Sequence, residues 1–108
     1  MNHITSPDYS DAGVEREILA KGLTEVRVTP ERINSLIVHK YFHVPEGTTL
    51  TLCVLTLANG FNVVGESACV NPLNFDSEIG EKIAFENARQ KIWALEGYLL
   101  AERSAAPL

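Results

Sequence analysis

The chain has 108 residues, of which 45% are hydrophobic and 21% are charged, so it is long enough for one globular domain with its own core. Its formal net charge of −5 argues against non-specific binding to DNA, RNA or an anionic membrane, although a few local cations could still hold a small anionic ligand. The cysteines, Cys53 and Cys69, are too few for a disulfide framework and lack metal-ligand spacing. The sequence has no apolar run of bilayer length and no signal-like N-terminus, which predicts a cytoplasmic protein.

Residues 1–28 predict a flexible polar arm followed by one short helix. We expect residues 1–10 to form the arm and residues 11–108 to form a single domain. Asp11 can cap a helix over 11–21, and Gly22 suits the position just beyond its end. At about three turns this helix is too short to be stable alone, so it should dock on its own chain or on a second copy.

A second helix is predicted over residues 30–42. Thr29-Pro30-Glu31 places an N-cap residue, a proline at the first helical position and an acid in the first turn. Apolar residues continue at helical spacing until Pro45. His39 and His43, at i and i+4, could be a metal pair, but no third ligand is recognisable and two exposed histidines are the favoured interpretation.

Two β-branched and aliphatic runs, 48–57 and 61–70, predict a β-hairpin. The Asn59-Gly60 pair between them is typical of a two-residue type I′ turn, which would place Thr56 opposite Val63. Both faces of this hairpin would be substantially apolar, so we expect helices to cover one face and a partner to cover the other. Because a lone hairpin is marginal in water, a third strand or a second subunit's hairpin should complete the sheet.

The C-terminal part of the chain predicts one long amphipathic helix from about Phe75 to Glu102, capped by Asn74, Asp76 or Ser77. Its length of roughly 40 Å exceeds what is needed to cover its own sheet, so we expect part of it to meet another subunit. The apolar residues that recur at steps of three to five are Ile79, Ile83, Ala84, Ala88, Ile92, Leu95 and Leu99.

Glycines inside the predicted elements suggest close backbone approaches. Gly97 in a helix costs about 1 kcal/mol relative to alanine, which a close approach of another backbone would explain. Gly80 has the same explanation, and Gly65 in the second hairpin strand suggests a bulge or a close approach. Together the elements predict an α+β fold. An antiparallel hairpin-based sheet would be packed by a short helix and one long C-terminal helix and would assemble as a homodimer or higher homo-oligomer.

Several motifs within Thr48–Leu100 carry a resemblance to a known family. They are Asn59-Gly60-Phe61, Gly65-Glu66-Ser67-Ala68-Cys69, Asn74-Phe75-Asp76, Ile79-Gly80, Ile83-Ala84, Asn87-Ala88, Trp93 and Leu95-Glu96-Gly97-Tyr98. This pattern resembles the small accessory-protein family of tailed bacteriophages and prophages named after gene products forty-nine and sixty-six. The resemblance implies a phage or prophage origin and expression inside an infected bacterium. It implies no catalytic residues and does not extend to the first 28 residues.

No motif in the sequence predicts catalysis. There is no nucleophile elbow, phosphate-binding glycine loop or cysteine–histidine arrangement, and Ser67 falls inside the second predicted hairpin strand. We therefore expect a protein that is not an enzyme and that uses neither a cofactor nor a metal.

Five residues on or beside the long helix are candidate ligand-binding residues. Phe75 or Trp93 could stack on a nucleobase, and Asn87 could hydrogen-bond a polar edge. Arg89 or Arg103 could pair with a phosphate. Each residue also has a plainer interpretation, which is the favoured one: a helix staple, a packing anchor, an exposed or inter-subunit amide, or a surface ion pair.

The leading functional hypothesis is a phage counter-defence protein that binds and sequesters a cyclic nucleotide-type immune signal without cleaving it. A cyclic ADP-ribose variant and a cyclic oligonucleotide are examples of such signals. The chain is similar in size and style to phage sponge proteins that block Thoeris signalling, which are small oligomers with pockets between subunits. The alternative is an acidic phage protein that inhibits a host protein by direct binding. A third hypothesis is a structural or regulatory phage protein without a ligand.

Overall fold

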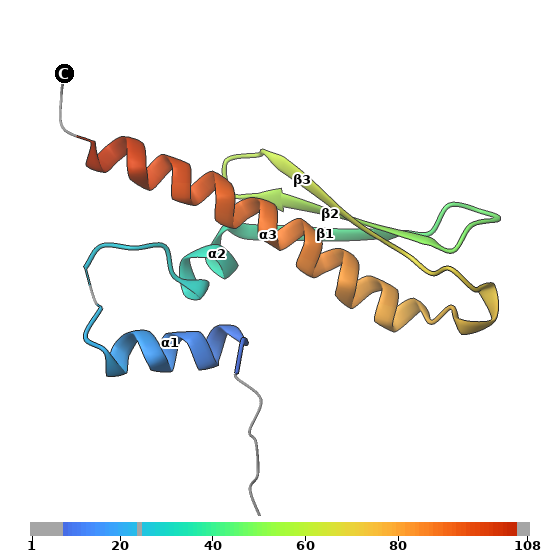
Figure 1. The fold of residues 1–108 in the computed structure, drawn as a ribbon. Helices are drawn as coiled ribbons and strands as arrows, with labels where there is room; N and C mark the ends of the chain where they lie inside the picture. The colour runs from blue at the N-terminus through green and yellow to red at the C-terminus, as the bar shows by residue number, and fades with distance from the viewer. Residues whose placement is uncertain (1–7, 24, 106–108) are drawn as a thin grey trace, which may run out of the picture.

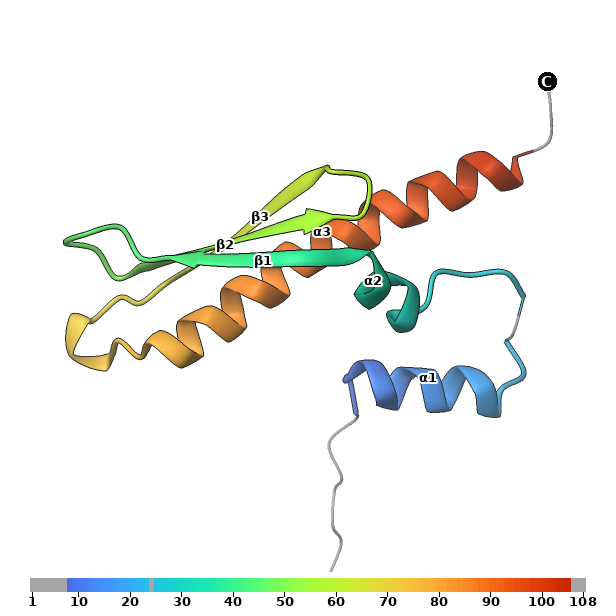
Figure 2. The same cartoon turned by 180° about the vertical axis from the view of Figure 1, so that it is seen from behind.

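The computed structural model describes residues 8–23 and 25–105, in which helices pack on one face of a small antiparallel sheet (Figure 1). The elements are α1 (Asp11–Ala20), α2 (Pro30–Leu36), β1 (Ile37–His43), β2 (Leu50–Leu57), β3 (Asn62–Ala68), the 3₁₀ turn η1 (Pro72–Asn74) and α3 (Ser77–Ser104). The strand order is β1-β2-β3. The long helix α3 crosses the sheet diagonally, and α1 lies on the side of α2 away from the sheet (Figures 1 and 2). The predicted α+β fold is confirmed, whereas the oligomeric state remains a prediction.

The first helix, α1, begins one residue away from the predicted cap. The Ser10 hydroxyl, not Asp11, accepts the Gly13 N–H at 3.1 Å, so Asp11 becomes the first helical residue and its carboxylate can bond elsewhere. The end of α1 is as predicted. Gly22 adopts a φ of +69°, and the N–H of Leu23 donates to the Ile18 carbonyl at 3.0 Å, as in a Schellman motif. The predicted arm, residues 1–10, lies mostly outside the described residues.

The helix predicted over 30–42 is wrong in its second half. The helix α2 starts as predicted, with the Thr29 hydroxyl accepting the Arg32 N–H at 3.2 Å, but it ends at Leu36. Residues 37–43 form β1 because their β-branched and aromatic side chains suit a strand and the edge of β2 offers them a ladder of hydrogen bonds. This third strand completes the sheet within one chain, as one of the two predicted alternatives required.

The histidines that were predicted on one helix face lie on this strand instead. Tyr41 stands between them, and its ring stacks on that of His43 with centroids 6.4 Å apart. Among the described residues, no group of three histidine, cysteine, aspartate or glutamate side chains could hold a metal ion.

The predicted register of the hairpin is wrong by one residue because its loop has three residues, not two. The Leu57 N–H donates to the Phe61 carbonyl at 2.8 Å, and Gly60 has a φ of +87°. No described residue other than glycine has a positive φ, so Asn59 does not adopt the type I′ conformation. Thr56 consequently lies opposite Asn62. Since strand side chains alternate, a shift of one residue exchanges the two faces of a strand.

The core lies between the sheet and α3. Its fully or nearly fully buried apolar residues are Ile33, Cys53, Leu55, Leu57, Val63, Ala84, Ala88 and Ile92. Burial raises the pKa of the Cys53 thiol, which suits a small core residue. Leu52 and Val54 would lie on the same face as Val63 if Thr56 were opposite Val63 as predicted, but they lie on the opposite, outer face. There Val54 pairs with the exposed side chains of Tyr41 and Val64. The helices thus cover one face as predicted, and a partner on the other face remains a prediction.

The predicted close approach of another backbone is confirmed at Gly65, whereas the close neighbours of Gly80 are side-chain atoms. A Cβ on Gly65 would overlap the Ala84 carbonyl and lie 2.8 Å from the Ala88 Cα, so β3 rests directly on the backbone of α3. A Cβ on Gly80 would lie 2.6 Å from the Thr51 hydroxyl. In contrast, a Cβ placed on Gly97 would meet no described atom within 4 Å beyond the neighbouring backbone of its own helix.

We expect Gly65→Ala to lower the free energy of unfolding by about 3 kcal/mol or more, because an added methyl group has no room between β3 and α3. Gly97→Ala is the matched control. It meets open space and should raise the free energy of unfolding by about 1 kcal/mol through helix propensity. Urea denaturation followed by circular dichroism measures both values. Equal stability of the two variants would contradict the direct packing of β3 on α3.

Candidate functional site

The five residues predicted to bind a ligand are spread along α3. From Phe75 to Arg103 the helix and its approach extend roughly 40 Å at 1.5 Å per residue. One pocket of a single chain therefore cannot contact all five. The structure brings only Arg89 and Trp93 together, with the guanidinium carbon 5.8 Å from the centre of the indole ring. Arg103 is exposed in the last turn of α3.

Phe75 lies half-buried at the start of α3, directly before the N-cap residue Asp76, which accepts the Ile79 N–H at 3.0 Å. It lines a cavity of about 160 Å³ together with Ile79 and Ser67. This cavity is smaller than the sites that hold drug-sized ligands, which usually span about 300–1,000 Å³. Phe75 thus packs at the entry to α3 and does not face Trp93 or Arg89.

Asn87 contacts the sheet of its own chain. Its side-chain amide donates to the main-chain carbonyl of Glu66 at 2.8 Å. Because Glu66 belongs to the edge strand β3, this hydrogen bond satisfies a carbonyl that has no strand beside it. Asn87 is an exposed residue, as one of its two plainer interpretations predicted, and its hydrogen bond joins α3 to β3 within one molecule.

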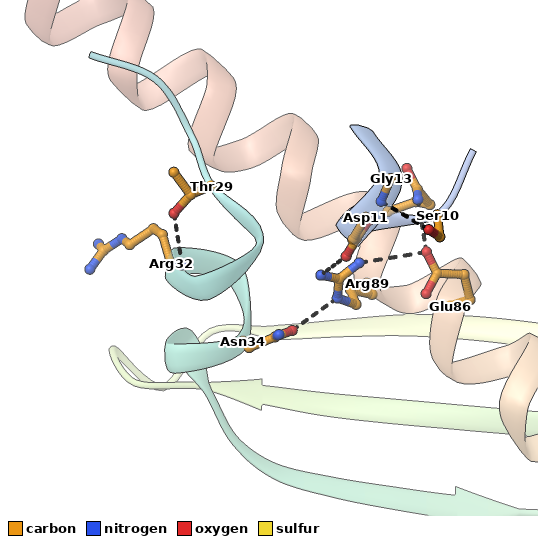
Figure 3. Close-up of polar contacts among 9 residues, drawn as sticks. Ser10, Asp11, Gly13, Thr29, Arg32, Asn34, Glu86 and Arg89 are labelled. Carbon is orange, nitrogen blue, oxygen red and sulfur yellow. Dashed lines mark hydrogen bonds and ion pairs between the residues drawn. The ribbon is translucent and has the colours of Figure 1, made fainter. Parts of the chain in front are cut away.

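Arg89 is the most buried charged side chain among the described residues, with 5% of its side-chain surface exposed. Its Nη2 donates to Asp11 of α1 at 2.6 Å, and its Nε donates to the Asn34 side-chain carbonyl of α2 at 3.1 Å (Figure 3). The Glu86 carboxylate lies 3.7 Å from Nη1. A buried charge requires such partners, because an unpaired charge in a low-dielectric interior is strongly unfavourable.

Sequence reasoning missed Asp11 and Asn34 as partners of Arg89. Asp11 and Arg89 are 78 residues apart in the sequence. The residues around Asp11 indicate only a helix-capping role for its carboxylate. Since the Ser10 hydroxyl caps α1, the Asp11 carboxylate is free to pair with Arg89, and no local sequence signal indicates this pair.

A second ion pair also ties α1 to the rest of the chain. Arg27 approaches Glu15 with both terminal nitrogens, at 2.6 and 2.8 Å from the two carboxylate oxygens. Parallel hydrogen bonds of this kind are geometrically specific and stronger than a single one. With Asp11–Arg89, this pair fixes α1 beside α2.

A larger groove lies between β3 and the second half of α3. It has a volume of about 550 Å³ and is lined by Phe61, Asn62, Val63, Val64, Lys91, Ala94, Leu95 and Tyr98. The lining combines an apolar floor with two aromatic rings, one amide and one ammonium group. None of the ion pairs among the described residues involves Lys91. The Asn62 side-chain carbonyl accepts from the Thr56 hydroxyl at 2.8 Å, which leaves the Asn62 NH₂ group as a donor.

Sequence reasoning missed this groove because the predicted two-residue turn assigned the strand residues to the wrong faces. A usable signal existed in the motifs themselves, since Phe61 and Tyr98 are the aromatic residues of Asn59-Gly60-Phe61 and of Leu95-Glu96-Gly97-Tyr98. Placing those two motifs side by side requires the register of β3 on α3, which local patterns do not encode.

The elements that form the groove lie within the part of the chain that matches a known protein family. A family model described as the phage protein (N4 Gp49/phage Sf6 gene 66) family matches residues 28–104, more than half of the chain. The chain belongs to this phage protein family. The match confirms the resemblance found over Thr48–Leu100 and extends it upstream through β1 and α2. We call residues 28–104 the family domain. No curated protein and no solved structure significantly matches the chain.

The helix α1 lies outside the family domain, yet it supplies the carboxylates that pair with Arg89 and Arg27. No helix in the part of the chain that the structure describes has both the length and the apolar character needed to cross a membrane.

Acidification should loosen the contact between α1 and Arg27, which directly precedes the family domain. Hydrogen bonding by Arg27 holds the pKa of Glu15 below its ordinary value of 4.5. The folded state therefore binds protons less readily than the unfolded state, so the Glu15 contribution to docking is complete above about pH 4.5 and is lost as the pH falls through the lower, folded pKa. Hydrogen-exchange protection of the α1 amides, compared at about pH 7 and about pH 3, should fall more than that of β2.

The variant Glu15→Gln should show reduced protection of α1 already at neutral pH. Glu17→Gln is its matched control, because Glu17 pairs only with Lys21 of the same helix and both side chains are exposed. Equal protection of α1 in the two variants would contradict a role for the Arg27 pair in docking.

Proposed function

We propose that this phage protein binds and sequesters a cyclic nucleotide-type signal of bacterial immunity, of the Thoeris or CBASS kind, without cleaving it. Its place of action would be the cytoplasm of the infected or lysogenic host. The observation that carries the proposal is the groove between β3 and α3, in which aromatic, amide and cationic groups converge on one space.

The groove has the size and chemistry that a nucleotide requires. Its volume of about 550 Å³ lies within the usual range for small-molecule sites. Phe61 and Tyr98 offer ring faces on which a base can stack, an interaction worth about 1–3 kcal/mol per base. The Lys91 ammonium can pair with a phosphate, and the Asn62 NH₂ group can donate to a base or ribose oxygen. Sequestration needs binding alone, so no catalytic group enters the proposal.

This proposal changes the residues that carry ligand binding. Arg89 already pairs with Asp11, and Asn87 already donates to Glu66, so neither is available in the way that the sequence suggested. Trp93 lies beside Arg89 and not in the groove. The ligand would instead contact Phe61, Lys91 and Tyr98.

A second copy of the chain would close the groove, which is open on one side in a single molecule. Along α3 there are also apolar side chains that are exposed in one chain, among them Ile79, Ile83 and Leu99. Covering these side chains would remove apolar surface from water, which favours association. The homodimer or higher oligomer thus remains part of the proposal.

One observation favours the alternative of direct binding to a host protein. The cross-strand row of Tyr41, Val54 and Val64 gives the outer face of the sheet an apolar centre. Exposed apolar patches of this kind often mark protein–protein contact sites. In that case the protein would act by covering a host surface and would need no small molecule.

The proposal predicts a thermal shift with a cyclic nucleotide. Purified protein should be heated with a panel of cyclic dinucleotides, cyclic trinucleotides and cyclic ADP-ribose variants. At least one of them should raise the melting temperature, because a ligand that binds only the folded state stabilises it. The same ligand should be recovered chemically intact after the protein is denatured. A panel without any shift would refute nucleotide sequestration.

Variants then locate the site. Tyr98→Ala should weaken binding of that ligand about tenfold or more, since a lost stacking contact of about 1–3 kcal/mol corresponds to such a change. Lys91→Ala should weaken it as well. Lys82→Ala is the matched control, because Lys82 is an exposed lysine of the same helix that pairs with Glu78 and does not line the groove. Equal effects of the two lysine variants would place the ligand elsewhere.

A further inference from the structure

We infer that Arg89 is the centre of an anion-binding socket in the family domain and that Asp11 of α1 occupies this socket within the same chain. The ligand class is an anionic oxo group, either a carboxylate or a phosphoryl group. This inference is independent of the proposed function, because the groove lies on a different flank of α3.

The socket is built by the family domain alone. Arg89 and Trp93 come from α3 and Asn34 comes from α2, all within residues 28–104. The Asn34 side-chain carbonyl accepts a hydrogen bond from Nε at 3.1 Å (Figure 3). The indole ring of Trp93 lies 5.8 Å from the guanidinium carbon. These contacts fix the plane of the guanidinium and leave the Nη2 donor directed at the Asp11 carboxylate. A fixed guanidinium of this kind recognises carboxylate and phosphoryl oxygens.

The occupant of the socket comes from outside the family domain. Asp11 is the one carboxylate of the described residues that lies within hydrogen-bond distance of Arg89. Glu86, the other acidic side chain facing the guanidinium, lies 3.7 Å away and already accepts a hydrogen bond from Gln90 at 2.9 Å. Without Asp11, the buried charge of Arg89 would keep only the more distant Glu86 carboxylate, 3.7 Å from Nη1, so another anion would be favoured in the place of Asp11.

The attachment of α1 permits such an exchange. Its apolar side chains are only partly covered, since Val14 is 43% exposed, Leu19 is 59% exposed and Ile18 is half-buried. The helix is held chiefly by two ion pairs, Asp11–Arg89 and Glu15–Arg27. Figure 3 shows Asp11 reaching Arg89 from the first turn of α1. A ligand that replaces Asp11 thus competes with one carboxylate and displaces a helix that is otherwise weakly packed.

Trp93 gives a direct measurement of the socket. It is the single tryptophan of the sequence and lies beside Arg89, so its fluorescence reports on a ligand bound there. The full chain and its Asp11→Asn variant should be titrated with inorganic pyrophosphate and, in a second arm, with glutarate. The first probe represents a phosphoryl ligand and the second a carboxylate ligand.

Asp11→Asn should bind one of the two probes about tenfold more tightly than the unaltered chain. The neutral asparagine does not compete as an anion for Arg89, so the socket is available to the probe for more of the time. Arg89→Gln introduced into the Asp11→Asn variant should remove this binding. Glu17→Gln, an exposed acidic residue of the same helix, is the matched control and should bind as weakly as the unaltered chain. The probe that binds more tightly identifies the ligand class.

The inference would be overturned if Asp11→Asn kept its circular dichroism spectrum but gained no affinity for either probe. It would also be overturned if the gain persisted after Arg89→Gln. Should Asp11→Asn fail to fold, Glu15→Gln provides the test, because it loosens α1 without altering the socket. That variant should also bind the probe more tightly, and an unchanged affinity would contradict the inference.

Discussion

The direct contact between β3 and the backbone of α3 at Gly65 is the constraint on which the rest of the structure depends. No side chain separates the strand from Ala84 and Ala88, so the helix lies as close to the sheet as two backbones permit. This close contact fixes both the distance between α3 and the sheet and the direction in which α3 crosses the sheet. It brings Asn87 within reach of the β3 edge, and it places Lys91 and Arg89 on different flanks of the helix. One packing contact thus positions the groove and the Arg89 cluster together.

The two flanks of α3 differ in how their charges are satisfied. On the flank facing α1 and α2, the arginine is enclosed and bonded to acidic and amide side chains. On the flank beside β3, the lysine stands at an open apolar groove. Although the chain has a net charge of −5, it therefore exposes one local cation, Lys91, at its surface and encloses another, Arg89, in its interior. Small anions can be attracted locally even though the protein as a whole repels a polyanion.

The parts of the fold that follow from neighbouring residues were predictable. The Thr29-Pro30 helix start and the start of the long helix at Asp76 depend on side chains that bond to nearby backbone. The helix end at Gly22 depends on the positive φ that glycine adopts readily. The identity of β1 was not predictable in this way. Ile33, Ile37 and Tyr41 have helical spacing, and only the hydrogen bonds offered by β2 decide for a strand.

The candidate site was less accessible to sequence reasoning, for two separate reasons. The Asn59-Gly60 pair is compatible with both two-residue and three-residue loops, and the choice between them decides which hairpin side chains face the core. The partnership of Arg89 with Asp11 joins segments 78 residues apart and has no local signature. The sequence therefore indicated which side chains could bind a ligand. It did not indicate which residues surround them in the fold, because that depends on long-range geometry.

The three-residue loop at Ala58–Gly60 has a consequence for how sequences of this kind can diverge. Although the loop is exposed, a change of one residue in its length would turn β3 over, and the buried Val63 and Gly65 would exchange faces with the exposed Asn62, Val64 and Glu66. Insertions and deletions in this loop must therefore change its length by an even number of residues, so that the same side chains of β3 still face the core. This solvent-facing loop should accordingly tolerate substitutions far more readily than a gain or loss of a single residue.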